Sequence, residues 1–224
     1  MHIKRLLNKN RTIKNANGIL LLLILSVIII APLFPQRYRT ITFSVLLFMI
    51  YITSVISIKQ KRSELFVAMT IMLVVQPLSN IFDLEIINIT ARALNVLFFL
   101  LLVFSYVIEV SKATTVDRKV IFEAINVYLL LGIVFALLIT ILMAFNHHSF
   151  SFPFSDNMQD DPGDYFAEYI YYAFVTFTTL GYGEIVPLTP AARSLAMLAA
   201  VTGQIYLAVV IAMLVGKFSN RKND

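Results

Sequence analysis

The stretch TFTTLGYGEIVP spans residues 176–187 and decides how the C-terminal third of the chain is interpreted. It places two of the chain's 7 glycines, Gly181 and Gly183, on either side of Tyr182. Glycine adopts positive φ at little cost, so successive carbonyls here can turn to one side instead of alternating as they do in a strand. The stretch therefore predicts a row of backbone oxygens facing one way.

The composition is that of a membrane protein. Hydrophobic residues make up 59% of the chain and charged residues 14%, whereas soluble domains average about 45–50% and about 25%. There is no cysteine, which excludes a disulfide framework, a thiolate metal site and a cysteine nucleophile. Neither G-x-S-x-G nor H-E-x-x-H occurs, so we do not expect an enzyme or a cofactor.

Six segments are long and apolar enough to cross a bilayer, which takes about 17–25 residues. They are residues 18–34, 40–58, 65–82, 93–110, 120–145 and 191–216. A seventh apolar segment, residues 165–179, is too short to span and ends in the quoted stretch. It fits a re-entrant helix, whose non-helical continuation must lie in protein or line a watery cavity.

The distribution of Lys and Arg favours cytoplasmic N and C termini in a multi-pass cell membrane protein. Of the 18 basic residues, only Arg37, Arg39, Arg92 and Arg193 fall on the outside in this arrangement. The net charge of +5 therefore reflects the excess of Lys and Arg on the cytoplasmic side of the membrane. We expect no nucleic-acid partner, because such a partner needs basic residues gathered on one binding face. A signal peptide is the alternative for the first span, but no small-residue cleavage site follows it.

The re-entrant segment is expected to begin at Asp164, a good N-cap that follows Pro162 and Gly163. Its chain enters from outside, so its C-terminal end directs the negative pole of the helix dipole toward the membrane middle. A cation is stabilised there. Four copies of the following segment around one axis would form stacked oxygen rings that replace the hydration shell of a permeating ion.

TTLGYG between two spanning helices resembles the potassium-channel signature, usually T-V-G-Y-G. Residues 191–216 are likewise similar to the inner helix of small prokaryotic potassium channels. The resemblance implies a homotetramer of prokaryotic origin with K⁺ bound at Thr179, Leu180, Gly181 and Tyr182, and with Gly183 closing the filter. Four residues are implied to support the filter from behind: Thr178, Tyr171, Tyr172 and Glu184.

Two positions depart from the usual signature. Leu180 stands where valine is usual, which changes the packing behind the filter more than the carbonyl that faces the ion. Glu184 stands where aspartate is usual, and its extra methylene leaves open whether the hydrogen bond behind the filter forms.

The sixth span begins with an N-cap signal at Thr189 and Pro190. Gly203 matches the gating-hinge glycine of the family, although glycine also eases close helix packing in membranes. One stripe of this helix is expected to face the central cavity: Gln204, Leu207, Ile211 and Val215.

The loop before the re-entrant segment adds acidic residues that would attract cations to an outer mouth, or merely keep the loop solvated. These acids are Asp156, Asp160, Asp161 and Asp164, together with Glu184 after the filter. His147 and His148 are either pH-sensitive or simply exposed.

The predicted organisation is all-α, with six transmembrane helices, a re-entrant pore helix and filter, and the topology of voltage-gated channels. It comprises a basic N terminus (1–17), a four-helix bundle without a charged sensor helix (18–117), a pore domain (118–217) and a short tail (218–224). The function expected is passive K⁺ conduction without steep voltage gating. A non-selective cation channel and a non-conducting scaffold are the alternatives, with lipids and an unidentified regulatory protein as further partners.

Overall fold

The computed structural model describes residues 16–58, 63–64, 66–72, 85–152 and 165–220. Residues 16–25 are helical and continue into a π-helix and a 3-10 helix, and residues 63–64 and 66–72 are helical as well. The elements in chain order are η1 Ser26–Ile30, η2 Ala31–Leu33, α2 Gln36–Ser57, α4 Glu85–Lys112, α5 Arg118–Phe145, β1 Phe150–Ser151, α6 Phe166–Phe177, β2 Val186–Pro187 and α7 Pro190–Asn220.

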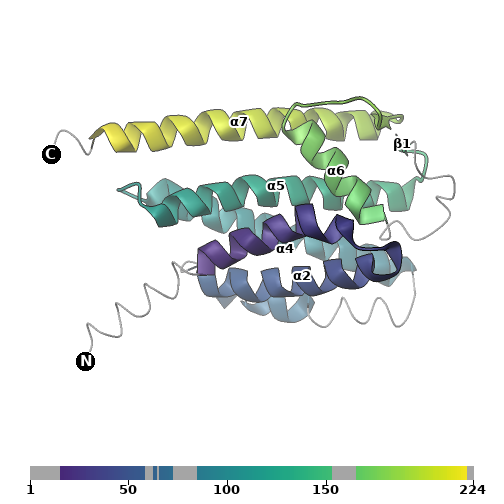
Figure 1. The fold of residues 1–224 in the computed structure, drawn as a ribbon, viewed down its shortest axis with the longest axis horizontal. Helices are drawn as coiled ribbons and strands as arrows, with labels where there is room; N and C mark the ends of the chain where they lie inside the picture. Colours follow the sequence, from purple (N-terminus) through teal and green to yellow (C-terminus); the bar gives the residue numbers. More distant parts are fainter. Residues whose placement is uncertain (1–15, 59–62, 65, 73–84, 153–164, 221–224) are drawn as a thin grey trace.

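The long helices lie side by side in layers (Figure 1). The first helix, α2 and α4 form a bundle, α5 packs against α4, and α7 lies beyond α5. The short helix α6 runs obliquely between α5 and α7 and contacts both. The first described helix begins, and α7 ends, on the same side of the molecule, as cytoplasmic N and C termini would require.

Within the described residues, five helical stretches are long and apolar enough to span a membrane. They are Ala16–Leu33, Arg37–Ser57, Asn88–Lys112, Arg118–Phe145 and Pro190–Lys217. They correspond to the first, second, fourth, fifth and sixth predicted spans. The third predicted span is helical over residues 66–72, and its residues 73–82 lie outside the described part of the chain.

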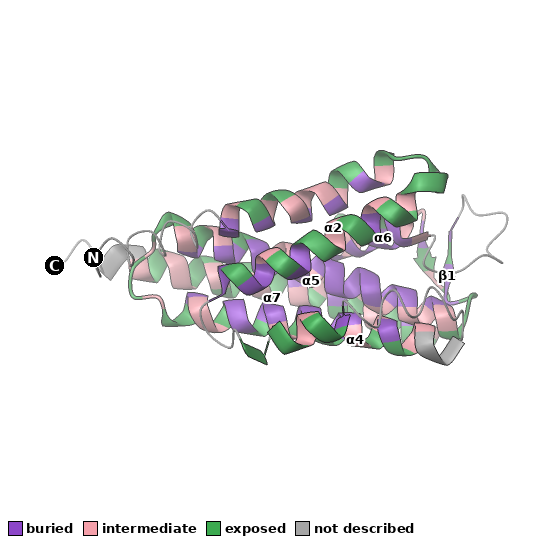
Figure 2. Ribbon diagram, turned by 90° about the horizontal axis from the view of Figure 1, so that it is seen from below, coloured by how far each residue is buried: buried purple, intermediate pink, exposed green. Residues whose placement is uncertain are grey.

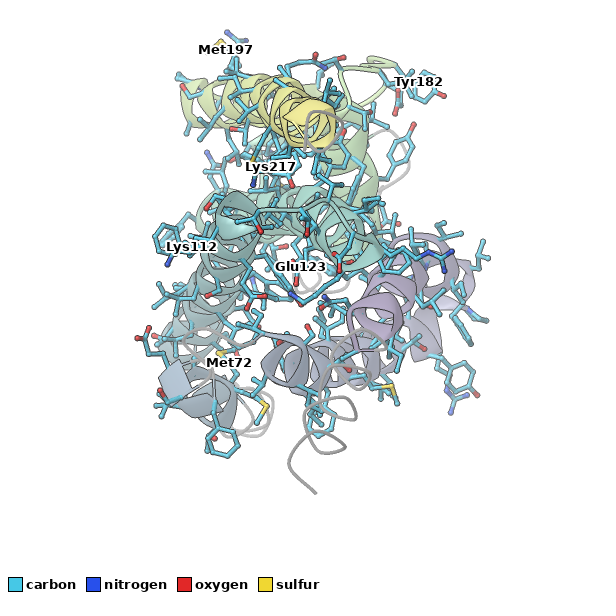
Figure 3. All side chains as sticks on the ribbon, turned by 90° about the vertical axis from the view of Figure 1, so that its left-hand side faces the viewer. Met72, Lys112, Glu123, Tyr182, Met197 and Lys217 are labelled. Atoms are coloured by element: carbon cyan, nitrogen blue, oxygen red, sulfur yellow. The ribbon has the colours of Figure 1, made fainter. Side chains whose placement is uncertain are left out.

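Helices α5 and α7 differ sharply in burial. The apolar window of α5 is 61% buried, whereas that of α7 is only 11% buried within one chain. Figure 2 shows α7 largely exposed beside the buried faces of α5. Met197, Val201 and Val209 project from α7 without cover from this chain, and Met197 points away from the other helices (Figure 3).

The structure contains a short antiparallel strand pair, which the all-α prediction did not include. Phe150 pairs with Pro187 and Ser151 with Val186, and the Leu188 amide donates to the Ser149 carbonyl over 2.8 Å. The sequence analysis predicted no strand, because two residues per strand are too few for an alternating pattern. This pair ties the chain after α5 to the end of the quoted stretch.

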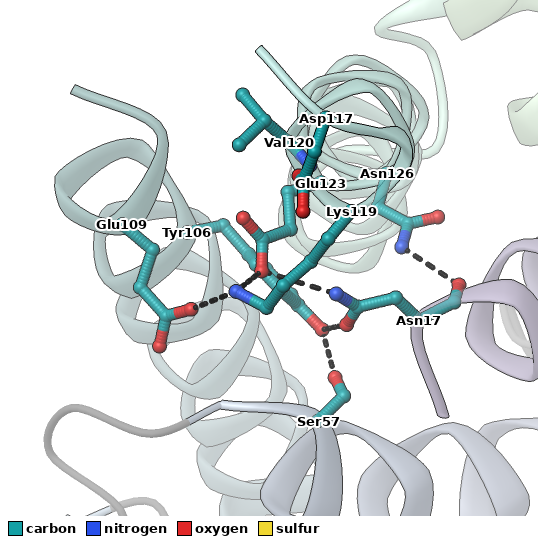
Figure 4. A network of polar contacts seen from close by, with 9 residues as sticks. All are labelled: Asn17, Ser57, Tyr106, Glu109, Asp117, Lys119, Val120, Glu123 and Asn126. Atoms are coloured by element: carbon teal, nitrogen blue, oxygen red, sulfur yellow. Dashed lines mark hydrogen bonds and ion pairs between the residues drawn. The ribbon is translucent and has the colours of Figure 1, made fainter. Parts of the chain in front are cut away.

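Buried charges join the bundle to α5 (Figure 4). Lys119 Nζ lies 2.9 Å from Glu109 Oε2 of α4 and also pairs with Glu123 of its own helix. Asn17 Nδ2 donates to Glu123 Oε1 over 3.0 Å, and Asn126 Nδ2 donates to the Asn17 carbonyl over 3.2 Å. A buried charge is costly unless it is paired and hydrogen-bonded, so this network specifies how the first helix, α4 and α5 meet.

Two further contacts attach the bundle to the helices beyond α5. Arg39 of α2 pairs with Glu168 in the first turn of α6, with Nη1 and Oε1 3.2 Å apart. Lys217 of α7 donates to the Val110 carbonyl over 3.0 Å and to the Ser111 carbonyl over 2.9 Å. The last carbonyls of a helix have no partner within it and form the negative pole of its dipole, so the Lys217 ammonium caps α4. Figure 3 shows Lys217 directed from α7 toward the α4 and α5 layer.

Candidate functional site

The short helix α6 positions the site. Its 12 residues rise about 18 Å at about 1.5 Å per residue, well below the bilayer core of about 30 Å. The helix begins after Tyr165, which forms no side-chain cap bond, and the predicted cap Asp164 lies outside the described residues. At its other end the Thr178 amide and hydroxyl both donate to the Phe174 carbonyl, over 2.9 Å and 2.7 Å. The helix therefore ends where the chain turns into the quoted stretch.

The backbone of residues 179–183 alternates between two conformations. Thr179, Gly181 and Gly183 have positive φ angles of 61°, 57° and 91°, whereas no positive φ occurs at Leu180 or Tyr182. In a strand, uniform φ and ψ make successive carbonyls point to opposite sides. Reversing the sign of φ at every second residue removes that alternation, as expected for Gly181 and Gly183. Thr179 was not predicted to adopt positive φ, which is uncommon for a residue with a Cβ.

The amides at the start of this segment are bound to the end of α6. The Thr179 amide donates to the Thr176 carbonyl over 2.9 Å. The amides of Leu180 and Gly181 donate to the Val175 carbonyl over 3.0 Å and 3.2 Å. Among the described residues, no backbone amide donates to a carbonyl of residues 179–183. The first three N–H groups of the segment thus face α6, and no backbone amide of the described residues occupies the segment's own carbonyl oxygens.

Two of the four predicted supporting residues meet behind the segment. The neighbouring Glu184 side chain raises the pKa of the Tyr171 hydroxyl, and Tyr182 contributes less in the same direction, so the longer glutamate lies close to α6. Tyr172 faces the core instead, with its ring centroid 5.1 Å from that of Phe150. The two tyrosines predicted to support the filter therefore lie apart, with Tyr171 near Glu184 and Tyr172 against Phe150 of β1.

Two glycines let neighbouring helices approach α6 closely. A Cβ on Gly132 of α5 would lie 2.4 Å from the Phe174 ring. A Cβ on Gly203 of α7 would lie 2.1 Å from the Phe177 carbonyl oxygen. Contacts this short do not occur in proteins, so both positions need glycine for packing. The hinge assigned to Gly203 stays a prediction, and α7 runs unbroken through this residue.

The stripe of α7 that is predicted to line the central cavity is exposed in the single chain. Leu207, Ile211 and Val215 are all uncovered, and Gln204 Nε2 donates to Thr179 Oγ1 over 3.2 Å. The start of the helix agrees with its cap signal, because the Ala192 amide donates to Thr189 Oγ1 over 3.2 Å. The stripe thus begins at the quoted stretch and runs along α7 away from it.

The predicted outer mouth is only partly described. Asp156, Asp160, Asp161 and Asp164 lie outside the described residues. His147 and His148 are exposed at the end of α5, and the His148 amide donates to Asn146 Oδ1 over 3.0 Å. The acidic ring and the pH sensor stay predictions.

A short helix that cannot span, a segment with one-sided carbonyls and two long apolar flanking helices form the unit from which ion-conducting pores are built. Residues 120–220 match a family model described as "Ion channel". The matched residues thus resemble an ion-channel domain, in agreement with the resemblance found in the sequence, and the five long apolar helices are those expected of a membrane protein. Comparison with curated proteins and with solved structures gave no match.

Two features of the site escaped the sequence analysis. The positive φ at Thr179 has no propensity signal, because threonine favours extended backbone. The bond between Gln204 and Thr179 joins residues 25 positions apart. A signal for it was present, since Gln204 is a polar residue on an otherwise apolar stripe, and polar groups in membrane helices seek a partner.

Proposed function

We propose that the chain is a potassium-selective channel that conducts K⁺ passively across the cell membrane. The observation that supports this best is the alternating backbone of residues 179–183, whose first three amides donate to α6 and whose carbonyls accept no backbone hydrogen bond among the described residues. Oxygen dipoles held in this way substitute for the hydration shell of K⁺. Four carbonyls and the Thr179 hydroxyl would bind the ions, contributed by Thr179, Leu180, Gly181 and Tyr182.

A homotetramer is part of the proposal. One chain contributes one such segment and cannot surround an ion with it. The exposed apolar face of α7 and the exposed Leu180 and Tyr182, which are 56% and 67% accessible, suit burial against other copies and lipid. The N and C termini would be cytoplasmic, and α6 would enter from the outer side.

Ion flux into liposomes tests the proposed function. Purified protein should give K⁺ uptake that greatly exceeds Na⁺ uptake under equal gradients, and a pore blocker should stop it. Equal K⁺ and Na⁺ uptake would instead indicate a non-selective cation channel. Absence of blocker-sensitive flux for either ion would indicate a non-conducting scaffold.

Opening is expected to depend only weakly on voltage. Steep sensors move several charges per subunit through the field, each worth about 2.3 kcal/mol per 100 mV. Between Arg92 and Glu109, α4 has no Lys, Arg, Asp or Glu, and Glu109 is fixed by Lys119. Open probability in planar bilayers should change little between about −100 and +100 mV, since few charges can move. A steep sigmoidal curve that survives Arg92→Gln would contradict this prediction.

A further inference from the structure

The bond from Gln204 to Thr179 gives α7 a direct role at the inner end of the proposed filter. Gln204 Nε2 donates to Thr179 Oγ1 over 3.2 Å. A threonine hydroxyl has one proton to donate and two lone pairs to accept with. Because one lone pair receives the Gln204 N–H, the other lone pair and the O–H direction are restricted. The rotation of the hydroxyl is therefore restricted by a side chain outside the filter.

The hydrogen bond from Gln204 matters because Thr179 has an unfavourable backbone conformation. Among the described residues, Thr179 is the only one other than glycine with a positive φ. The left-handed conformation costs a residue with a Cβ about 1–2 kcal/mol, so surrounding contacts must maintain it. Two such contacts are present. The Thr179 amide N–H donates a hydrogen bond to the Thr176 carbonyl, and the Thr179 hydroxyl accepts one from the Gln204 side chain.

The position of Gln204 is itself fixed by its neighbour. Gly203 lies against the Phe177 carbonyl so closely that a Cβ would not fit. Two consecutive residues of α7 thus contact the end of α6 and the residue that opens the filter. A shift of α7 at this point would move the amide donor relative to Thr179.

We propose that Gln204 is a positioning residue for the innermost K⁺ site, and that it acts by orienting the Thr179 hydroxyl. The proposal rests on the proposed function, since it assigns a residue to the same conduction site. It also makes the filter sensitive to the position of α7 through one identified hydrogen bond.

Gln204→Met tests this, because methionine has similar length and no N–H donor. We expect the K⁺ to Na⁺ permeability ratio in planar bilayers to fall about two- to tenfold, the effect of losing one hydrogen bond. Leu198→Met, also on α7 and exposed but outside this stripe, is the matched control and should keep the wild-type ratio. The ratio does not depend on the number of channels, so it separates positioning from reduced folding.

A double-mutant cycle with Thr179→Val shows whether Gln204 acts through the hydroxyl. Adding Gln204→Met to Thr179→Val should cause no further loss of K⁺ preference. Should a variant conduct too little, the extra thermal stability given by K⁺ over Na⁺ reports ion binding without current. Gln204→Met should reduce that difference.

The outcomes distinguish the two proposals. A selective wild type with an unchanged Gln204→Met variant would overturn the role of Gln204 and leave the proposed function standing. The role of Gln204 would also be overturned if Gln204→Met lowered the K⁺ to Na⁺ permeability ratio by a similar factor in the Thr179→Val background. A wild type without K⁺ preference would overturn both.

Discussion

Gly181→Ala should abolish selective K⁺ current. Gly181 has a φ of 57°, and an alanine in the left-handed region costs about 1–2 kcal/mol in each of four subunits. A backbone that relaxes to negative φ turns a carbonyl away from the row, so the ion loses a ring of ligands. Flux into liposomes should lose its preference for K⁺ over Na⁺ or fall to background.

Gly18→Ala is the control for this variant. Like Gly181, Gly18 has no atom within 4 Å of a new Cβ, but it does not have a positive φ. The two substitutions therefore add the same methyl group to open space and differ in backbone conformation. Wild-type K⁺ preference in Gly181→Ala would refute the assignment of this carbonyl to the ion path.

Gly203→Ala should disrupt the pore domain. Its Cβ would lie 2.1 Å from the Phe177 carbonyl oxygen, and backbone cannot move aside as a flexible side chain can. Overpacking of this kind costs about 1–3 kcal/mol, and displacement of α7 would also break the bond to Thr179. We expect a lower melting temperature in detergent, fewer assembled channels and loss of K⁺ current.

The same variant separates packing from hinge bending at Gly203. If this glycine served only as a hinge, alanine would stabilise α7 by about 1 kcal/mol and reduce opening without lowering the melting temperature. Gly216→Ala lies in the same helix with no atom within 4 Å of the new Cβ. Gly216→Ala therefore measures the effect of replacing a helical glycine by alanine without any steric clash. An equal melting temperature in Gly203→Ala and Gly216→Ala would contradict the packing prediction.

Much of the fold follows from hydropathy, because a spanning helix requires a long apolar run. The ends of α5 and α7 agree with the predicted spans within a few residues. At α4 the helix begins at Glu85, well before the predicted residue 93, because amphipathic turns at a membrane surface lack an apolar signal. The strand pair and the π-helical turn depend on local contacts that periodicity cannot reveal.

The site was predictable where glycine imposes a conformation and unpredictable where tertiary contact does. Gly181 and Gly183 indicated positive φ directly, whereas Thr179 adopts it only because α6 and Gln204 hold it. The separation of Tyr171 from Tyr172 follows from the helix itself, since adjacent residues point about 100° apart. The Lys119 network depends on Asn17, more than 100 positions away in the chain, and no local pattern connects them.

In addition to the Lys119 network at α5, the bundle contacts α6 through Arg39 and Glu168 near one end and α7 through Lys217 and the α4 terminus near the other. Because these two contacts lie near opposite ends of the helices, a tilt of the bundle against α5 would strain at least one of them. A thinner or thicker bilayer changes the preferred tilt of spanning helices. A tilt of the bundle would therefore act on both the short helix and the end of α7 through these contacts, without any charge moving in the electric field.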